Sequence, residues 1–224
     1  MSATPTSNPR VMCFVDGFNL YHSVKAAERA LPGTQLKWLN IPALSSSFMH
    51  VIGGGAQMTA THYFTAYADH LRPQYPDKIR NHRALVRALT ATGANAHVSH
   101  FQQKQVWSHD ANRWVKVYEE KETDVLLACT VLKRAFRDEL DVALLMTGDT
   151  DFVPLVREFR EIFPAKRILF AFPFARSNKQ LEQLCPDSFK ISKESYRRHQ
   201  YPDAVRLPSG KFVTIPNAWK GHRS

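Results

Sequence analysis

The feature that most constrains the fold is a regular alternation of strand-like and helix-like segments along the chain. Short apolar runs typical of buried strands alternate with longer stretches whose apolar residues recur every three or four positions, as on one face of a helix. This alternation favours an α/β protein whose mostly parallel sheet is covered by helices on both faces. The strands are expected at 11–15, 59–67, 96–101, 142–146, 168–172 and 189–191, and the helices at 18–31, 41–52, 78–91, 123–136, 152–163 and 179–184.

One of these predicted helices, at 123–136, follows a strongly acidic stretch. Thr123 is a suitable N-cap residue, because its hydroxyl can accept a hydrogen bond from a free backbone amide of the first turn. The apolar residues that follow recur at helical spacing, so we expect one stripe to face the core. The predicted core stripe consists of Val125, Leu126, Cys129, Leu132, the stem of Lys133, and Phe136.

The pattern divides the chain into a main domain and two ends of different character. Residues 1–10 are polar and predict a flexible N-terminus, whereas residues 11–192 carry the alternating pattern of the domain. Two strand-like runs flank a polar turn, which predicts a β-hairpin insertion at 104–118. Residues 193–224 are basic and contain several prolines, and we expect them to form an extension that crosses the surface of the domain.

Charge is distributed unevenly along the sequence. The chain has 224 residues and a formal net charge of +10, so a polyanion is the first partner to consider. Residues 1–118 carry a net charge of +7, residues 119–161 one of −5 and residues 162–224 one of +8. The acidic middle segment has two interpretations, a solvated helix face or a cation site surrounded by a basic surface.

Cysteine use and hydropathy bear on the compartment. Cys13, Cys129 and Cys185 are odd in number and far apart, and they form no CxxC pair, which is typical of a protein in a reducing compartment. The first ten residues lack the apolar stretch of a secretory signal. No apolar run approaches the roughly 20 residues that a membrane helix needs. We therefore expect a cytoplasmic protein that does not enter a membrane.

Carboxylates follow two of the predicted strands. Asp16 comes directly after the first strand, and Asp149 and Asp151 follow the apolar strand at 142–146. Because ligands bind at the carboxyl ends of parallel strands, these residues and Asp124, in the first turn of the preceding helix, are expected at one edge. Each could simply cap a helix. Clustered carboxylates repel one another unless a cation or protons neutralise them, and Mg²⁺ or Mn²⁺ would meet that need.

Other motifs are excluded by their spacing. A calcium EF-hand loop that begins at Asp149 would need a Glu at its twelfth position, where this chain has Arg160. An Asp-x-Asp pair also occurs in nucleotide-sugar transferases, but that match explains neither Asp16 nor Asp124. The glycines at 53–55 are not followed by Gly-Lys-Ser/Thr, so they form no P-loop.

Three motifs together carry a resemblance to a known family. They read Val-Asp-Gly-Phe-Asn at 15–19, Glu-Lys-Glu-Thr-Asp-Val at 120–125 and Thr-Gly-Asp-Thr-Asp-Phe-Val-Pro-Leu-Val at 147–156. In this order and spacing the chain resembles the NYN domain of the PIN-like nuclease superfamily, in particular its LabA-like branch, over about residues 11–192. Thr147 stands where the family usually has Ser before Gly-Asp, and Thr123 stands where it usually has a smaller residue.

The resemblance implies both a fold and a chemistry. The implied fold is a Rossmann-like three-layer α/β/α sandwich with a central, mostly parallel sheet, as in PIN-like proteins. The implied activity is Mg²⁺- or Mn²⁺-dependent cleavage of phosphodiester bonds, usually in RNA. The resemblance makes four acids metal-binding and catalytic, with Asn19 as a polar partner near the scissile phosphate. The four are Asp16, Asp124, Asp149 and Asp151.

Polar and aromatic residues elsewhere are candidates for contact with nucleic acid. The candidates for direct substrate binding are Lys104, Lys121, Thr147, Arg176, Ser177 and Asn178, although an ordinary capped turn explains 176–178 and a solvated ion pair explains Lys121 equally well. A wider set of basic and aromatic side chains makes a plausible RNA path. It comprises Tyr21, His22, Lys37, Trp38, Tyr67, His70, Arg72, Tyr75, His100, Trp107, His109, Arg113, Trp114 and Lys116.

Three functions remain open on the sequence. The favoured one is a metal-dependent ribonuclease that acts on RNA or on single-stranded DNA. The first alternative is a catalytically silent RNA-binding or regulatory module, and the second is a phosphatase or nucleotidase that uses the same metal site. The sequence leaves the oligomeric state open between a monomer and a homodimer.

Overall fold

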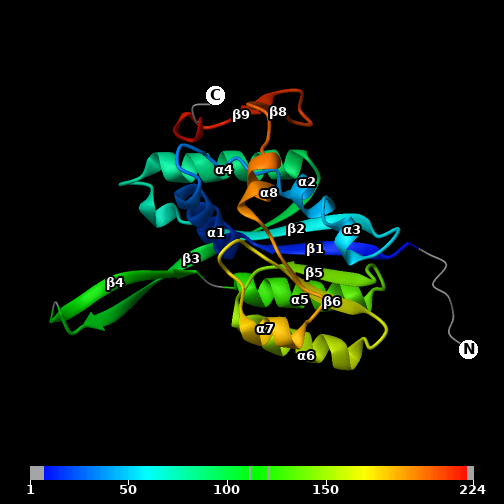
Figure 1. Ribbon diagram of the computed structural model, residues 1–224. Coiled ribbons are helices and arrows are strands. Elements are labelled where there is room, and N and C mark those ends of the chain that lie inside the picture. The colour runs from blue at the N-terminus through cyan, green and yellow to red at the C-terminus, as the bar shows by residue number, and fades with distance from the viewer. Residues whose placement is uncertain (1–7, 111, 121, 221–224) are drawn as a thin grey trace, which may run out of the picture.

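The centre of the molecule is a seven-stranded sheet, seen in a computed structural model that describes residues 8–110, 112–120 and 122–220 (Figure 1). The strand order is β4-β3-β2-β1-β5-β6-β7, and every neighbouring pair is parallel except β3 and β4. The strands are β1 Arg10–Asp16, β2 Gln57–Tyr67, β3 Ala94–Ser108, β4 Arg113–Glu120, β5 Val142–Met146, β6 Arg167–Phe172 and β7 Phe189–Lys190.

Helices cover both faces of this sheet, and Figure 1 shows α1, α2, α4 and α8 on one side and α5, α6 and α7 on the other. They are α1 Gly17–Ala30, α2 Ile41–Ser46, α3 Met49–Ile52, α4 Pro76–Ala91, α5 Thr123–Phe136, α6 Val153–Ile162, α7 Lys179–Leu184 and α8 Lys193–Arg198, with short 3₁₀ turns η1 Asp69–Leu71, η2 Thr150–Phe152 and η3 Asn217–Trp219. The prediction of an α/β fold with a mostly parallel sheet flanked by helices is confirmed.

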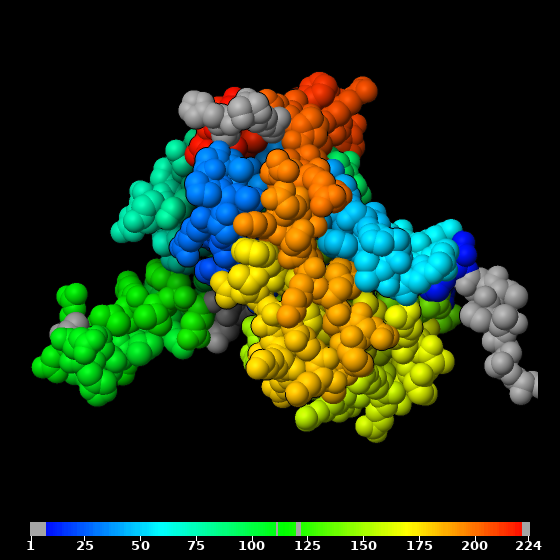
Figure 2. All heavy atoms as spheres, viewed as in Figure 1, coloured from blue at the N-terminus to red at the C-terminus, as the bar shows by residue number. Residues whose placement is uncertain are grey.

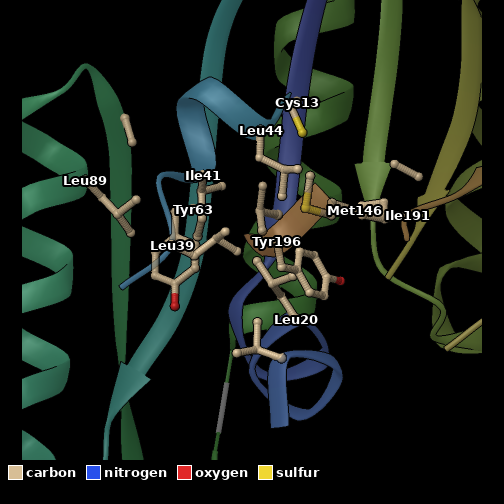
Figure 3. Packing of buried hydrophobic residues seen from close by; sticks show 14 of the residues in the cluster. Cys13, Leu20, Leu39, Ile41, Leu44, Tyr63, Leu89, Met146, Ile191 and Tyr196 are labelled. Carbon is tan, nitrogen blue, oxygen red and sulfur yellow. The ribbon is translucent and has the colours of Figure 1, made fainter. Parts of the chain in front are cut away.

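The alternation of side chains in β1 explains the two cores. Val11, Cys13 and Val15 point to the face of α1, α2 and α4, whereas Met12 and Phe14 point to the face of α5 and α6. All of β5 is buried, as expected for a central strand covered on both sides. Figure 3 shows the first core, in which residues of the sheet pack against α1, α2 and the C-terminal segment.

The predicted core stripe of α5 is wrong. The buried residues are Thr123, Leu127, Thr130, Val131 and Ala135, and Leu132 is only partly buried. Of the predicted stripe, Val125 is 68% exposed and Phe136 is 82% exposed, and Leu126 and Cys129 are also exposed. Small and β-branched residues let the helix approach the sheet closely, so its larger apolar side chains lie on the outer face. Thr123 is the first residue of the helix, and its buried hydroxyl makes no hydrogen bond within the described residues.

The C-terminal segment differs from the surface extension that the sequence suggested. Tyr196 of α8 is fully buried, and its hydroxyl lies 2.8 Å from the Ser23 hydroxyl of α1. The segment continues into a small antiparallel sheet of β8 (Ala204–Arg206) and β9 (Phe212–Thr214), from which Val205 and Val213 join the first core. Residues 193–220 therefore close one side of the domain.

The strands β3 and β4 form an arm that leaves the body of the molecule (Figure 2). The first part of β3 pairs with β2 as far as His100, and the rest pairs only with β4, from Phe101 opposite Glu120 to Ser108 opposite Arg113. The strand predicted at 96–101 and the first strand of the predicted hairpin are thus one continuous strand. Trp107 and Trp114 lie edge to face across the arm, and both are exposed.

Within residues 8–110, 112–120 and 122–220, no helix is both long and apolar enough to cross a bilayer.

Candidate active site

The four predicted acids lie at the edge of the sheet where β1 and β5 end. These strands are neighbours, with Val15 opposite Met146, and the winding order of the sheet reverses between them. Asp16 ends β1, Asp149 follows β5, and Asp151 lies in η2 immediately afterwards. Asp124 comes from the first turn of α5. A switch point of this kind is where open parallel sheets bind ligands.

Asp16 is held rigidly by hydrogen bonds. It is 6% exposed and caps α1, with Oδ1 accepting from the backbone amides of Phe18 and Asn19 at 3.0 Å each. Oδ2 accepts from the Thr147 hydroxyl at 2.9 Å. The hydroxyl that Thr147 shares with Ser is thus used to orient the buried acid, which ties the end of β1 to the end of β5.

The loop after β5 is connected to α1 by a second set of contacts. Asn19 Oδ1 accepts a hydrogen bond from the Gly148 amide at 3.2 Å. This bond uses the oxygen of the Asn19 carboxamide and not its Nδ2 donors. The Asp149 amide donates to Thr147 Oγ1 at 3.2 Å, and the Asp151 amide donates to Asp149 Oδ1 at 3.0 Å. These bonds fix the backbone of the loop that carries both acids.

The carboxylates affect one another electrostatically. Partial desolvation and the charges of Asp16, Asp149 and Asp151 raise the pKa of Asp124 to about 6. Burial, assisted by the charge of Asp149, also raises the pKa of Asp16, although the hydrogen bonds from Asn19, Thr147 and Phe18 oppose the shift. The edge therefore concentrates negative charge that a bound cation would neutralise.

The donor chemistry fits a hard divalent cation that keeps part of its water shell. In the part of the chain that the structure describes, no three His, Cys, Asp or Glu side chains converge closely enough to enclose an ion. Mg²⁺ does not require such a cage, because it is usually bound by one or two carboxylates together with waters and substrate phosphates. Asp124 and Asp151 are the most available of the acids, since both are exposed and no described residue is seen to donate a hydrogen bond to either carboxylate.

The loop after β6 lies against the acidic edge. A Cβ placed on Gly148 would fall 1.6 Å from the Arg176 carbonyl oxygen, so only glycine allows this close approach. The Arg176 side chain is exposed. Partial burial of His22 and the positive charge of Arg176 lower the pKa of His22, whereas the charge of Asp16 raises it. Arg176 therefore adds positive charge close to the acids.

The remaining predicted substrate residues differ in position. Asn178 caps α7 by accepting hydrogen bonds from the amides of Gln180 and Leu181, and Ser177 is exposed beside it. Lys104 lies on the β3–β4 arm and forms an ion pair with Glu119. Lys121 lies outside the described residues.

Several members of the wider RNA path are also placed by the structure. The prediction that Trp38 contacts RNA is wrong, because Trp38 is 1% exposed and its Nε1 donates a hydrogen bond to the Pro202 carbonyl.

His70, in contrast, belongs to a row of rings that leads from the acidic edge to the arm. The row joins Phe18 to Phe101 at 5.9 Å, Phe101 to His70 at 4.9 Å and His70 to Tyr118 at 4.1 Å between ring centroids.

Sequence reasoning missed Phe18, Phe101 and Tyr118 in this row. Phe18 lies inside the first motif, two residues after Asp16, so its place beside the acids could have been inferred from the motif itself. Phe101 gives no such signal, because its contact with Phe18 depends on where β3 leaves the sheet.

Comparisons with known proteins bear on the family and the fold of the chain. The family model of the NYN domain matches residues 10–192. No curated protein matches the sequence significantly. A crystal structure of a protein of unknown function from Vibrio parahaemolyticus has a similar fold, with a TM-score of 0.54 over 84% of this chain and 96% of that one, at 16% sequence identity. At this identity the likeness concerns the fold alone.

Proposed function

The chain belongs to the NYN domain family, a PIN-like nuclease family, and on that premise we propose that it is a metal-dependent ribonuclease of the LabA-like branch. The observation that carries the proposal is the group of acids at the switch point of the sheet, where desolvation and then the charges of Asp16, Asp149 and Asp151 raise the pKa of Asp124 to about 6. Helix capping explains Asp16 and Asp149, which cap α1 and η2, but it explains neither Asp124 nor Asp151, whose carboxylates make no capping hydrogen bond among the described residues.

Asp16, Asp124, Asp149 and Asp151 would hold one or two Mg²⁺ or Mn²⁺ ions. When bound, such an ion lowers the pKa of a water molecule and offsets the negative charge of a phosphate. Asp16, fixed by Thr147 and by two backbone amides, supplies a carboxylate that does not need to reorganise. Asp16 is therefore already in place for a cation, to which the more exposed acids would add their carboxylates.

Two neighbouring side chains are suited to position the phosphate. Asn19 uses its Oδ1 to accept from Gly148, and its Nδ2 is then oriented to donate to a phosphate oxygen. Arg176, exposed on the loop after β6, offers a guanidinium that pairs well with a phosphate. The aromatic row from Phe18 to Tyr118 provides stacking surfaces for unpaired bases beyond the cleavage site.

The test is a cleavage assay on fluorescent single-stranded RNA, single-stranded DNA and double-stranded RNA, with Mn²⁺ and with EDTA. Wild-type protein should cut single-stranded RNA only in the presence of Mn²⁺. Asp149→Asn should lower the rate by at least about 100-fold, because it removes a charged metal ligand. Asp187→Asn is the matched control, since Asp187 forms a surface ion pair with Arg167 and should leave the rate unchanged.

The outcomes separate the alternatives. Binding of RNA without any cleavage, and with no loss of binding in Asp149→Asn, would make the chain a silent binding module. Turnover of small phosphoesters in preference to polymers would make it a phosphatase or nucleotidase. Equal rates for wild type and Asp149→Asn would contradict the assignment of the metal-binding acids.

A further inference from the structure

A cavity of about 580 Å³ lies next to the acidic edge, between α1, β2 and α4. Its lining begins with Gly17 and Phe18, the first two residues of α1, which directly follow Asp16. The Asp16 carboxylate is close enough to raise the pKa of Tyr63, another lining residue, although burial is the larger cause. The volume is within the range of about 300–1,000 Å³ that is typical of small-molecule sites.

The walls of this cavity are mainly apolar and aromatic. Rings come from four different parts of the chain, α1, β2, β3 and the C-terminal segment, and Leu39 and Ile41 complete one side beside Tyr63 (Figure 3). The aromatic lining residues are Phe18, Tyr21, Tyr63, Phe101 and Trp219. Flat walls of this kind suit a planar ligand, because rings stack on rings.

One buried polar atom in the lining lacks a hydrogen-bond partner within the described part of the chain. His70 Nδ1 is buried and makes no hydrogen bond there. Buried polar groups are almost always satisfied, and leaving one unpaired is costly. Asn81 of α4, which is 9% exposed, adds a carboxamide to the same lining. A ligand with polar atoms on its edge would satisfy His70 Nδ1.

Charged side chains also line the cavity. Lys37, Lys78 and Asp77 contribute to the lining, and Lys78 rests over the exposed ring of Tyr75 at 3.8 Å from the centroid. Lys37 forms an ion pair with Glu28 at 3.0 Å. The cavity thus offers planar walls, one buried nitrogen without a partner among the described residues, and charged side chains of both signs, and its lining begins one residue after a buried carboxylate.

We propose that this cavity binds an unpaired nucleobase of the strand whose phosphate lies at the acidic edge. The inference rests on the proposed nuclease function and specifies its substrate. A base can enter the cavity only when it is not paired or stacked within a duplex. The cavity therefore selects single-stranded nucleic acid, and the row from Phe101 to Tyr118 continues the path for the neighbouring bases.

The test measures nucleotide binding without any cleavage step. The probes are AMP, GMP, CMP and UMP, with ribose 5-phosphate as the probe that lacks a base, and binding to the full chain is followed by saturation-transfer NMR in EDTA. At least one nucleotide should bind about tenfold or more tightly than ribose 5-phosphate, as expected for stacking and edge contacts. Leu85→Trp, which places an indole into the cavity from α4, should lower the affinity for that nucleotide by at least about tenfold.

Two further variants keep the result interpretable. Ile162→Trp introduces the same side chain at an exposed position of α6 on the opposite face of the sheet and should leave binding unchanged. Phe101→Ala removes one aromatic wall of the cavity without adding bulk, and it should also lower the affinity for the nucleotide. This second variant keeps the test valid if Leu85→Trp fails to fold.

The proposal is overturned if no nucleotide binds, if ribose 5-phosphate binds as tightly, or if both cavity variants bind like wild type. Failure here is distinct from failure of the nuclease assignment. RNA cleavage without base-dependent binding would reject only the proposal that the cavity binds a base. Base binding in the cavity without RNA cleavage would reject only the proposed nuclease activity.

Discussion

The first turn of α1 separates two regions whose polar atoms are satisfied in different ways. On one side, Asp16 and Asn19 face the loop after β5, where backbone amides and the Thr147 hydroxyl satisfy most polar atoms. On the other side, Phe18 faces an aromatic cavity in which the buried His70 Nδ1 lacks a partner within the described residues. The acidic edge has its polar atoms oriented in advance, whereas the cavity leaves one of them to a ligand.

The two regions also respond to protons in opposite directions. At the acidic edge, desolvation and mutual repulsion raise the pKa of Asp124 to about 6, so protonation relieves the repulsion. In the cavity, burial lowers the pKa of His82 to about 4, and the neutral ring pairs with the Thr65 hydroxyl at 3.1 Å. Protonation there places a positive charge where burial and the nearby Arg83 disfavour it. Substitutions in the two regions should therefore have effects that differ in sign as well as in size.

The largest effect is expected from Gly148→Ala at the acidic edge. The new Cβ would meet the Arg176 carbonyl oxygen at 1.6 Å, so the loop must move and the bond from Gly148 to Asn19 is lost. We expect the free energy of unfolding to fall by about 3 kcal/mol or more and the cleavage rate to fall at least about 100-fold. Chemical denaturation and the RNA assay measure the two effects.

The matched control for this change is Gly54→Ala, since a Cβ at Gly54 meets no atom within 4 Å. Wild-type activity in Gly148→Ala would show that the contact between the two loops does not position the acids.

An intermediate effect is expected from His82→Gln in the cavity. The unfolded state takes up a proton near pH 6.5 and the folded state only near pH 4, so wild-type stability falls as the pH drops through this window. For His82 the loss reaches about 2–3 kcal/mol near pH 4.5. Because glutamine does not titrate, the variant should lose less stability than wild type between pH 7 and pH 4.5 in urea denaturation.

His109→Gln, at an exposed histidine in the turn of the β3–β4 arm, serves as the control and should follow wild type. An acid loss in His82→Gln as large as that of wild type would mean that His82 is not the titrating group.

The smallest effect, and one of opposite sign, is expected from Asp124→Asn. The raised pKa means that the folded state holds the proton more tightly than the unfolded state, so wild-type stability falls as the pH rises from about 4 to about 6. Removal of the charge should stabilise the metal-free protein at pH 7 by about 1 kcal/mol, a value reduced for the partial exposure of the side chain, and raise Tm by about 2–4 °C.

Thermal denaturation in EDTA measures this gain, which should disappear near pH 4. Added Mn²⁺ should stabilise wild type more than the variant, because ligand binding to the folded state adds to stability. A variant less stable than wild type in EDTA would show that Asp124 makes a structural contact instead of contributing repulsion.

Much of the fold could be predicted from local patterns. The apolar run at 142–146 predicted a central strand, because only a strand covered on both faces is apolar at every position. The motifs around Asp16 and Asp149 predicted a shared edge, since the carboxyl ends of parallel strands lie together. The orientation of α5 could not be predicted in this way, because both of its faces are apolar and helical periodicity does not say which one is buried.

The sequence by itself determined the α/β class, the family motifs and the placement of acids at strand ends, because each of these depends on residues that are close along the chain. The tertiary structure alone decided which face of α5 is buried, that Tyr196 and its neighbours close the first core, and that an aromatic cavity lies beside Asp16. Those features join segments far apart in the sequence. Their positions follow from how the helices pack on the sheet, and no local periodicity records that packing.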